Sequence, residues 1–441
     1  MQTPPLQNTP LESSTIAIIG LGYVGLGLSL ELGRYYTTLG YDSDLARVRE
    51  LESSYDSRGE CERQAFAKAL NLRFVCDPSE LKQAQIYIIA VPTPITHDKL
   101  PDLSCLQSAC ALVGALLDPG DIVVFESTTY PTCTRTFCAP LLESASDLVL
   151  NRGFYLGYSP ERINPSDKAH TLSQVRKITS GSNDKSAALI DKLYASIIPA
   201  GTHLVSSIEV AEACKALENA QRDVNIALMN EAYMLFDTLG LDMGEILRAA
   251  STKWNFLPFH PGLVGGHCIS VDPYYLAHIA QQCGCESGLI TAARVVNESM
   301  AAFLAHKIAK SLAKQGIAVL GSRVLIVGFA FKKDCRDVRN TKAPLLCAEL
   351  EALGARVEVL DSLVDRELVR KSYGREILHA QDLVGDYGDL EAQSVVDSLD
   401  SGGRYDAVFV NILHTCDSML DLRTLCKRNG VFLSINGISP Y

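Results

Sequence analysis

Short apolar runs alternate with stretches of helical periodicity along most of the chain. The runs are rich in β-branched residues and lie at 15–20, 37–42, 73–76, 86–91, 121–127 and 153–159. Parallel strands are buried on both faces and are joined by helices. The alternation therefore predicts a parallel sheet that is covered by helices on both sides.

A long helix is predicted after this region. Residues 205–239 contain neither Gly nor Pro, and their apolar residues recur close to the helical period. We expect about nine turns of helix. Its apolar packing residues would be Val210, Cys214, Leu217, Val224, Leu228 and Leu235. A second helical block covers 286–315.

Apolar runs resume in the last third of the chain, at 323–331, 356–361, 405–413 and 431–436. The predicted fold class is α/β, with two parallel-sheet domains joined by a helical middle that contains one long helix. The domain limits that follow are 1–204, 205–315 and 316–441.

Composition narrows the class of protein. With 441 residues, 47% of them hydrophobic, the chain is long enough for several cores. Its net charge of −11 argues against nucleic acid or an anionic membrane as partner. An anionic substrate would need a local cluster of Arg and Lys.

Targeting and metal-binding patterns are missing from the sequence. The first residues, MQTPPLQNTPLESS, have neither the basic nor the apolar region of a signal peptide, and the apolar runs are too short to span a membrane. The fourteen cysteines include no C-x-x-C pair, so no zinc-type metal site is expected. We expect a cytoplasmic protein with reduced thiols.

A glycine-rich loop follows the first predicted strand and precedes a helix. The sequence GLGYVG is followed, 17 residues after its last glycine, by Asp42 at the end of the next strand. This context predicts a Rossmann-like domain that binds a dinucleotide through its pyrophosphate and ribose. The Asp42 carboxylate would repel a 2′-phosphate, so NAD is favoured over NADP. The predicted contacts are Gly20, Gly22, Tyr23, Val24, Gly25 and Asp42, with Arg47 near the adenosine.

Hydroxyl and charged side chains follow later strands of the same domain. Thr93 and Thr128 lie in such loops, where turn chemistry is an equal explanation, and Glu161-Arg162 follow another strand as a site pair or a surface ion pair. On the long helix, Lys215, Asn219 and Arg222 are spaced i, i+4, i+7 and share one face. That face is either solvated or directed at a substrate.

The stretch GLVGGHCISVDPYY, residues 262–275, contains a cysteine after two glycines. Cys268 is either a small buried filler or a reagent, with Asp272 four residues on. In the last domain, Phe331-Lys332 begins a basic loop before a helix, which is typical of an anion site. That domain lacks G-x-G-x-x-G, so we expect it to hold no dinucleotide of its own.

These blocks, in this order, resemble the UDP-glucose/GDP-mannose dehydrogenase family from Thr15 to Asp421. The matching blocks are GLGYVG, VPTPI, ESTTYP, SPERINP, KALENAQRDVNIALMNE, GGHC and GFAFKKD…RNT. The stretch 252–275 is most similar to the branch that acts on UDP-N-acetylhexosamines. The resemblance implies an NAD-binding first domain, a central domain and a UDP-binding last domain. The apolar helical middle suggests that it forms the contact of a homodimer, and the resemblance extends this to a higher homo-oligomer.

The resemblance also implies residue roles. Cys268 would be the nucleophile, Lys215 the proton donor or acceptor, and Asp272 and Glu161 acid/base groups, with Asn219 and Thr128 also at the reacting centre. Substrate contacts would be Glu161, Arg162, Ile163, Lys215, Asn219, Arg222, Gly265, Phe331 and Lys332. Cofactor contacts would include Val24, Asp42, Arg47, Thr93, Thr128 and Arg339.

The chain departs from the family pattern at a few positions. Pro165 and Val271 stand where the UDP-glucose type has Glu and Lys, which disfavours UDP-glucose as the substrate. Thr129, Ser251 and Ser270 replace the Val, Gly and Gly of the hexosamine branch. UDP-glucose and UDP-N-acetylmannosamine remain alternative substrates.

The implied reaction requires a nucleophile such as the Cys268 thiolate. Oxidising a primary alcohol to a carboxylate takes two hydride transfers to NAD, and a thiolate adduct of the intermediate aldehyde provides the second hydride. A two-electron hydroxyacid-type dehydrogenase would not need Cys268, and a nucleotide-sugar sensor would need neither the thiol nor a hydride acceptor. The product would feed surface polysaccharide synthesis.

Overall fold

The computed structural model describes residues 11–59, 61–162, 172–384 and 404–435. The chain forms two compact units, each with its own core. The first unit comprises 1–219 and 271–287, and the second comprises 220–270 and 288–441. The residues predicted as a helical middle are thus divided between the two units.

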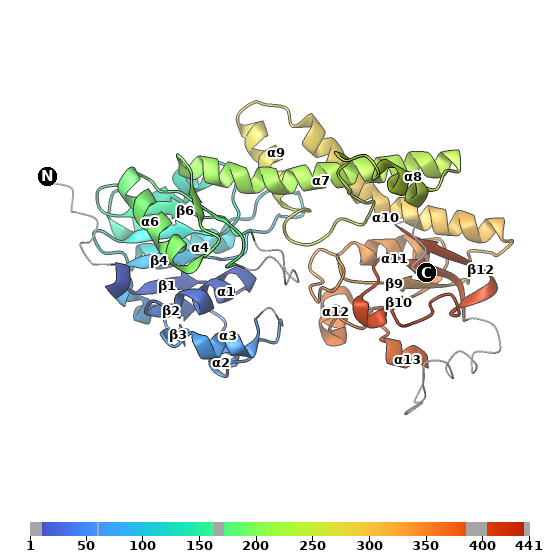
Figure 1. Cartoon of the computed structure of the whole chain (residues 1–441), viewed down its shortest axis with the longest axis horizontal. Helices are drawn as coiled ribbons and strands as arrows, with labels where there is room; N and C mark the ends of the chain where they lie inside the picture. The colour runs from blue at the N-terminus through green and yellow to red at the C-terminus, as the bar shows by residue number, and fades with distance from the viewer. Residues whose placement is uncertain (1–10, 60, 163–171, 385–403, 436–441) are drawn as a thin grey trace. The chain divides into compact units, whose positions relative to one another are not determined.

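The first unit is built on a six-stranded parallel sheet with the order β3-β2-β1-β4-β5-β6 (Figure 1). This is the doubly wound order of dinucleotide-binding folds, and it confirms the predicted parallel sheet. The strands are β1 Ile16–Ile19, β2 Thr38–Tyr41, β3 Leu72–Val75, β4 Ile86–Ile89, β5 Ile122–Phe125 and β6 Tyr155–Tyr158.

Helices and a small second sheet complete the first unit. The helices are α1 Tyr23–Leu32, α2 Leu45–Glu52, α3 Arg63–Lys68, α4 Ser104–Gly114, α5 Ala139–Ser146, α6 Asp184–Ile197 and α9 Asp272–Gln282. Short helical turns are η1 Leu11–Ser13, η2 Pro78–Gln83 and η3 Thr134–Cys138. The small parallel sheet pairs β7 Lys177–Thr179 with β8 Thr202–Leu204.

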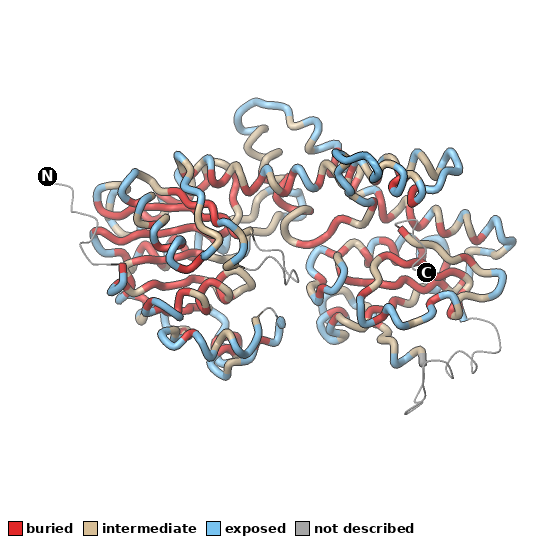
Figure 2. Tube along the Cα trace, in the orientation of Figure 1, coloured by how far each residue is buried: buried red, intermediate tan, exposed pale blue. Residues whose placement is uncertain are grey.

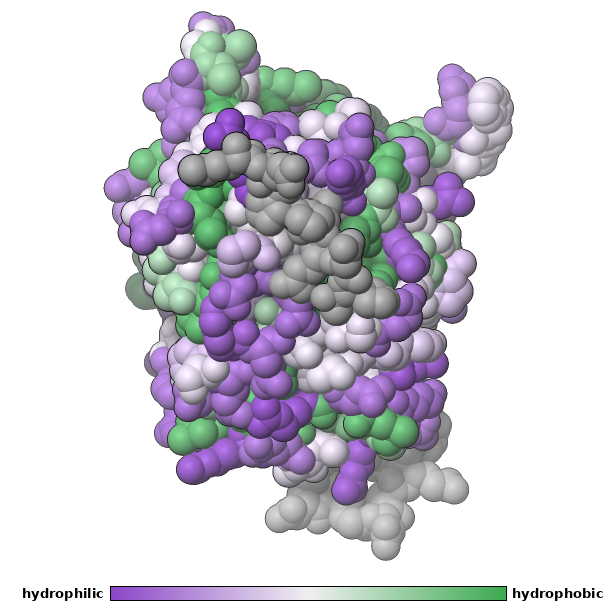
Figure 3. All heavy atoms as spheres, turned by 90° about the vertical axis from the view of Figure 1, so that its left-hand side faces the viewer, coloured by the Kyte–Doolittle hydropathy of each residue, from purple (hydrophilic) through white to green (hydrophobic). Residues whose placement is uncertain are grey.

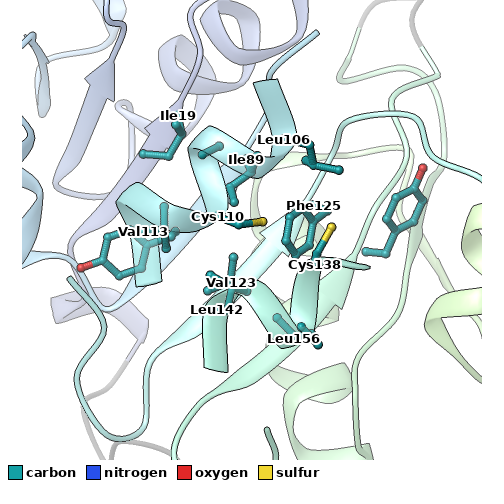
Figure 4. Close-up of a cluster of buried hydrophobic side chains, with 14 of the residues drawn as sticks. Ile19, Ile89, Leu106, Cys110, Val113, Val123, Phe125, Cys138, Leu142 and Leu156 are labelled. Carbon is teal, nitrogen blue, oxygen red and sulfur yellow. The ribbon is translucent and has the colours of Figure 1, made fainter. Parts of the chain in front are cut away.

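Two apolar clusters cover the two faces of this sheet. Along β1, Ala17 and Ile19 belong to one cluster, whereas Ile16 and Ile18 belong to the other, as the two-residue period of a strand requires. Figure 4 shows the first cluster, in which side chains of the strands face those of α4 and α5. Its cysteines, Cys110, Cys133 and Cys138, are fully buried packing residues. All fourteen cysteines of the chain are free thiols.

The second unit contains a four-stranded parallel sheet with the order β10-β9-β11-β12. Its strands are β9 Arg323–Val327, β10 Arg356–Leu360, β11 Tyr405–Val410 and β12 Cys426–Ser434. Its helices are α8 Met243–Ala250, α10 Gly288–Lys314, α11 Ala343–Ala352, α12 Arg366–Tyr373 and α13 Ala380–Val384, with the turn η4 Thr415–Asp417. Figure 2 shows the central strands of both sheets in the buried colour.

The long helix α7, Ile208–Leu239, has nearly the predicted extent. Of its six predicted packing residues, Cys214 and Val224 are half-buried, and Cys214 packs against the core of the first unit, but the other four are exposed. Val210, Leu217, Leu228 and Leu235 are 45%, 64%, 59% and 55% exposed. Apart from Ile208 and Tyr233, the buried positions are small or polar, among them Ala211 and Asp223. Periodicity shows that apolar residues share a stripe but not that the stripe is buried, so the assignment was wrong for Val210, Leu217, Leu228 and Leu235.

The surface is mixed in character. On the face drawn in Figure 3, apolar residues are scattered between hydrophilic ones, as is usual for a protein surface. Within the described ranges, the helices are too short or too polar to cross a bilayer.

Two glycines of α1 provide a matched test of the tight loop before this helix. A Cβ at Gly25 would lie 1.8 Å from the Gly20 carbonyl oxygen, whereas a Cβ at Gly27 meets nothing within 4 Å. We expect Gly25→Ala to cost about 3 kcal/mol and to lower the melting temperature by roughly 6–12 °C. Gly27→Ala should instead stabilise by about 0.5–1 kcal/mol, because it removes the entropy cost of a helical glycine. Equal melting temperatures for the two variants would contradict this description of the loop.

Candidate active site

The glycine loop between β1 and α1 forms an open cradle at a helix N-terminus. Gly20 has φ +95°, a conformation that favours glycine, and its amide donates to the Tyr41 carbonyl at 2.8 Å. Helix α1 has Gly22 as its N-cap, so no side chain caps the first amides of the helix. Asp42 at the end of β2 accepts from the Leu21 amide at 2.9 Å, which fixes a carboxylate beside the cradle.

These features fit the pyrophosphate and the adenosine ribose of NAD. Uncapped helix amides bind phosphate oxygens, and a carboxylate accepts from ribose hydroxyls. The half-buried Gly22, Tyr23 and Val24 border the same loop. Their contacts with the cofactor remain a prediction.

Arg47 lies on α2 beneath this loop. Its side chain is only 3% exposed, and its guanidinium donates to the Leu21 carbonyl at 3.2 Å and to Asp56 at 2.8 Å. The structure therefore gives Arg47 a supporting role for the glycine loop. Its predicted contact with adenosine remains a prediction.

The loops that carry Thr93 and Thr128 follow the neighbouring strands β4 and β5. The Ser127 hydroxyl donates to the Val91 carbonyl at 2.8 Å, which ties the two loops together. The Tyr275 hydroxyl, from α9, donates to the Thr93 carbonyl at 2.8 Å. Both threonines thus lie at the carboxyl edge of the sheet, where such folds bind ligands.

Glu212 fixes the chain that follows Thr128, and sequence reasoning did not identify it. This fully buried carboxylate of α7 accepts from the Thr129 hydroxyl at 3.1 Å and from the amides of Thr132 and Thr134 at 2.6 and 2.8 Å. Burial raises the pKa of Glu212 to about 7, and the bonds from Thr134 are the largest opposing influence. The departure at Thr129 therefore provides a further donor to this carboxylate.

Lys215, Asn219, Asp272 and Glu161 are brought together in the first unit. The Asn219 amide donates to the Asp272 carboxylate at 2.5 Å, and the Lys215 ammonium donates to the Glu161 carbonyl at 2.6 Å. All four residues are at most 6% exposed. Burial raises the pKa of Asp272 to about 6, although the charge of Lys215 and the bond from Asn219 oppose the rise. Of the helical face predicted from spacing, Lys215 and Asn219 are therefore part of a buried polar cluster, whereas Arg222 is exposed.

A second buried cluster lies behind Glu161. The Lys177 ammonium bonds to the Glu126 carboxylate, donates to the Pro160 carbonyl at 3.0 Å and lies 3.7 Å from the Glu161 carboxylate. The Tyr194 hydroxyl donates to Glu126 at 2.5 Å. Burial raises the pKa of Glu126 to about 7 against the opposing charge of Lys177. Sequence reasoning did not identify the Lys177–Glu126 pair, because the two residues are 51 positions apart in the chain.

Arg162 is half-buried and held in place. Its guanidinium donates to Glu218 of α7 at 2.5 Å and to the Arg176 carbonyl at 3.0 Å. The predicted substrate contact Ile163 lies outside the described residues.

In the second unit, the segment before Cys268 is packed tightly against the basic loop. A Cβ at Gly265 would lie 2.8 Å from both the Asn340 carbonyl oxygen and the Phe331 Cβ, and Gly266 has φ +84°. Because Gly265 and Gly266 have no side chain, Phe331 and Asn340 can pack directly against their backbone. Cys268 itself is partly exposed, and its role as a nucleophile remains a prediction.

His267 precedes the cysteine and was not singled out from the sequence. Burial lowers the pKa of His267 to about 4, and the nearby charge of Arg339 lowers it further, whereas Asp337 raises it. The imidazole is therefore neutral at physiological pH.

The loop that carries Phe331 and Lys332 is held by a buried carboxylate. Asp361 accepts from the amides of Phe329 and Ala330 at 2.8 and 3.0 Å. The Lys332 ammonium lies 5.9 Å from the centroid of the Phe331 ring. The loop thus presents a half-buried cation on a rigid backbone.

The remaining predicted contacts of the second unit are exposed. Arg222 lies on the solvent side of α7, and Arg339 donates to Asp337 at 2.7 Å. A role for Arg222 with substrate and for Arg339 with cofactor remains a prediction.

Comparisons with known proteins agree with this geometry. Residues 14–198 match the NAD binding domain of the UDP-glucose/GDP-mannose dehydrogenase family, 209–299 match its central domain and 325–431 match its UDP binding domain. A UDP-N-acetyl-D-glucosamine 6-dehydrogenase of Salmonella typhi is 48% identical over 82% of this chain and 86% of its own. Protein CapL of Staphylococcus aureus is 42% identical over 95% of this chain and 98% of its own.

A solved structure shares the fold. The UDP-D-ManNAc dehydrogenase of Pyrococcus horikoshii superposes with a TM-score of 0.80, at 28% identity, over 96% of this chain and 99% of that chain. The three family domains match in order, and the first of them coincides with the Rossmann sheet and its glycine loop. The chain belongs to the UDP-glucose/GDP-mannose dehydrogenase family and binds NAD through its first domain.

Proposed function

We propose that this chain oxidises the C6 hydroxymethyl group of a UDP-N-acetylhexosamine, with UDP-N-acetylglucosamine as the first choice, to the uronic acid. The observation that carries the proposal is the buried Asp272–Asn219 pair beside Lys215. Asp272 is the acid/base group, and Lys215 is the cation near it. The identity of 48% with a UDP-N-acetyl-D-glucosamine 6-dehydrogenase supports this choice of sugar.

In the first oxidation, the Asp272 carboxylate takes the proton of the C6 hydroxyl group. NAD⁺, when bound, accepts hydride from C6 in each of the two oxidations. The Lys215 ammonium, held by the Glu161 carbonyl, stabilises negative charge on the C6 oxygen. One such donor typically contributes about 3–4 kcal/mol to transition-state stabilisation.

In the second oxidation, the Cys268 thiolate adds to the aldehyde carbon. A C–S bond forms, the carbonyl oxygen takes a proton, and C6 again bears a hydrogen that can leave as hydride. Loss of this hydride and of the hydroxyl proton gives a thioester. Water then cleaves the C–S bond, which releases the carboxylate and returns the thiol.

The UDP moiety requires cations in an acidic protein. Lys332 presents an ammonium from a loop of the UDP-binding domain, and a charge-assisted bond to a diphosphate oxygen is stronger than a neutral one. We assign Lys332 to the diphosphate and Phe331 to the same subsite.

The exposed stripe on α7 is the proposed contact with a second copy of the chain. Val210, Leu217, Leu228 and Leu235 repeat along one helix, and large apolar side chains in such a row are typical of an interface. A homodimer, or a higher homo-oligomer built from it, would bury them. The free thiols fit a cytoplasmic enzyme, and the proposed role of its product is to supply surface polysaccharide synthesis.

Cys268→Ser tests the covalent mechanism. A serine hydroxyl is a poor nucleophile at neutral pH, so we expect uronate formation from UDP-N-acetylglucosamine to fall by about 10³-fold or more. Product mass spectrometry and NADH absorbance measure the loss. Cys283→Ser, at an exposed cysteine, is the matched control and should retain wild-type turnover. Normal uronate formation by Cys268→Ser would refute the mechanism.

Asp272 should set the acidic limb of the pH profile. Because its pKa is raised to about 6, the carboxyl is protonated below pH 6 and loses its capacity as a base, so kcat should fall as the pH drops through 6. Asp272→Asn should lower kcat by about 10²–10⁴-fold and abolish this limb. Steady-state rates between pH 5 and 9 provide the measurement. A limb near pH 6 that persists in the variant belongs to another group.

Lys332 and Lys333 are neighbours with different surroundings and form a matched pair. Lys332 is half-buried against Phe331, whereas Lys333 is exposed. Lys332→Ala should raise KM for the UDP-sugar by about 10-fold or more and leave the affinity for NAD⁺ nearly unchanged, since a charge-assisted hydrogen bond contributes about 1.5–3 kcal/mol. Lys333→Ala should change KM little. Titration calorimetry with UDP checks both, and equal affinities for UDP in Lys332→Ala and wild type would contradict the assignment.

A further inference from the structure

The segment that leads to Cys268 contains no helix or strand from Gly262 to Ser270, yet a side chain of α7 fixes its start. The Asn230 amide donates to the Gly262 carbonyl at 3.1 Å and accepts from the Gly262 amide at 2.8 Å. One carboxamide therefore pairs with both backbone groups of a single residue, as a neighbouring strand would. Asn230 is fully buried, so water does not compete for these bonds.

A chain of buried polar groups sets the orientation of this amide. Arg294 of α10 donates to Asp223 at 2.6 Å, and the Asn297 amide also donates to Asp223, at 2.7 Å. The amide nitrogen of Asn297 thus faces the carboxylate, which leaves its oxygen to accept from Asn230 at 2.8 Å. A guanidinium only donates and a carboxylate only accepts, so one orientation of both amides satisfies every bond.

The same segment is fixed again just before the cysteine. The Gly266 carbonyl accepts from the Asn340 amide at 3.1 Å and from the Ser270 hydroxyl at 2.5 Å. Cys268 lies between Gly266 and Ser270, in a part of the segment that has little freedom to move. The departure at Ser270 supplies one of these two bonds.

A contribution to folding stability alone does not explain why these buried residues are polar. Asp223, Asn230, Arg294 and Asn297 are at most 2% exposed, and buried ion pairs can often be replaced by apolar groups without loss of stability. What an apolar replacement cannot do is pair with the amide and the carbonyl of Gly262. These four buried polar side chains therefore determine the path of the backbone toward Cys268.

We propose that Asn230 is a positioning residue for Cys268, oriented through Asn297 by the Arg294–Asp223 ion pair. The proposal rests on the proposed function, in which Cys268 is the nucleophile of the second oxidation. Loss of the carboxamide frees Gly262, so the bonds of Gly266 to Asn340 and Ser270 are left to hold the segment, and the thiol can shift from its attack position. A displacement of about 1 Å can reduce the rate of a reaction about 10²-fold.

Two half-reactions of the same intermediate test this role. The C6 aldehyde of UDP-N-acetylglucosamine can be oxidised with NAD⁺, which requires the thiol, or reduced to the alcohol with NADH, which does not. We expect Asn230→Ala to slow the oxidation by about 10–100-fold and to leave the reduction within about threefold of wild type. Asn230→Asp, which keeps an acceptor for the Gly262 amide but has no donor for its carbonyl, should behave in the same way.

The ratio of the two rates does not depend on how much of the variant is folded. Asn230→Ser, a milder change, is measured in parallel so that the ratio is obtained even when Asn230→Ala yields little protein. Thr238→Ala, which removes an exposed side-chain bond to the Met234 carbonyl on the same helix, is the control and should leave both rates unchanged. Equal losses in both half-reactions, or no loss in either, would overturn the proposal.

Cys268→Ser separates this proposal from the one on which it rests. If Cys268→Ser loses aldehyde oxidation and the Asn230 variants keep it, the positioning role alone is refuted. If Cys268→Ser oxidises the aldehyde at the wild-type rate, the covalent mechanism and the positioning role are both refuted.

Discussion

The burial of Asp272 against the Asn219 amide is the interaction on which the proposed chemistry depends. A carboxylate loses favourable hydration when it is buried, and its pKa rises unless donors or cations compensate. Here the amide of Asn219 and the charge of Lys215 compensate in part, so the pKa settles at about 6. Asp272 also opens helix α9, whose N-terminal dipole favours a negative charge. The result is a buried group that is still mainly ionised at neutral pH.

Helix α7 makes this arrangement possible because it carries several buried polar groups on one face. Glu212, Lys215 and Asn219 follow each other at intervals of three and four residues, and each bonds to a different segment of the first unit. In the second unit, Asn230 of the same helix bonds to the segment of Cys268. Polar side chains that would weaken an ordinary core helix here determine where loops lie.

The sequence predicted the regular elements and the spaced residues better than it predicted their partners. The strands, the long helix and the parallel sheets were recognisable because each depends on local periodicity. The joint burial of Lys215 and Asn219 was one of two alternatives that spacing left open. The Lys177–Glu126 pair and Glu212 were missed, since Lys177 and Glu126 are 51 residues apart and Glu212 lies 83 residues from Thr129 in the chain. The four exposed apolar residues of α7 were predicted to be buried, because helical periodicity shows which residues share a face but not whether that face is covered.

In the proposed reaction, the chain removes four electrons from each sugar. The most direct test is to count NADH formed per UDP-N-acetylglucosamine consumed at completion, with the product identified by mass spectrometry. We expect two NADH for each sugar, together with the uronic acid. One NADH for each sugar, with the aldehyde as the final product, would contradict the four-electron reaction.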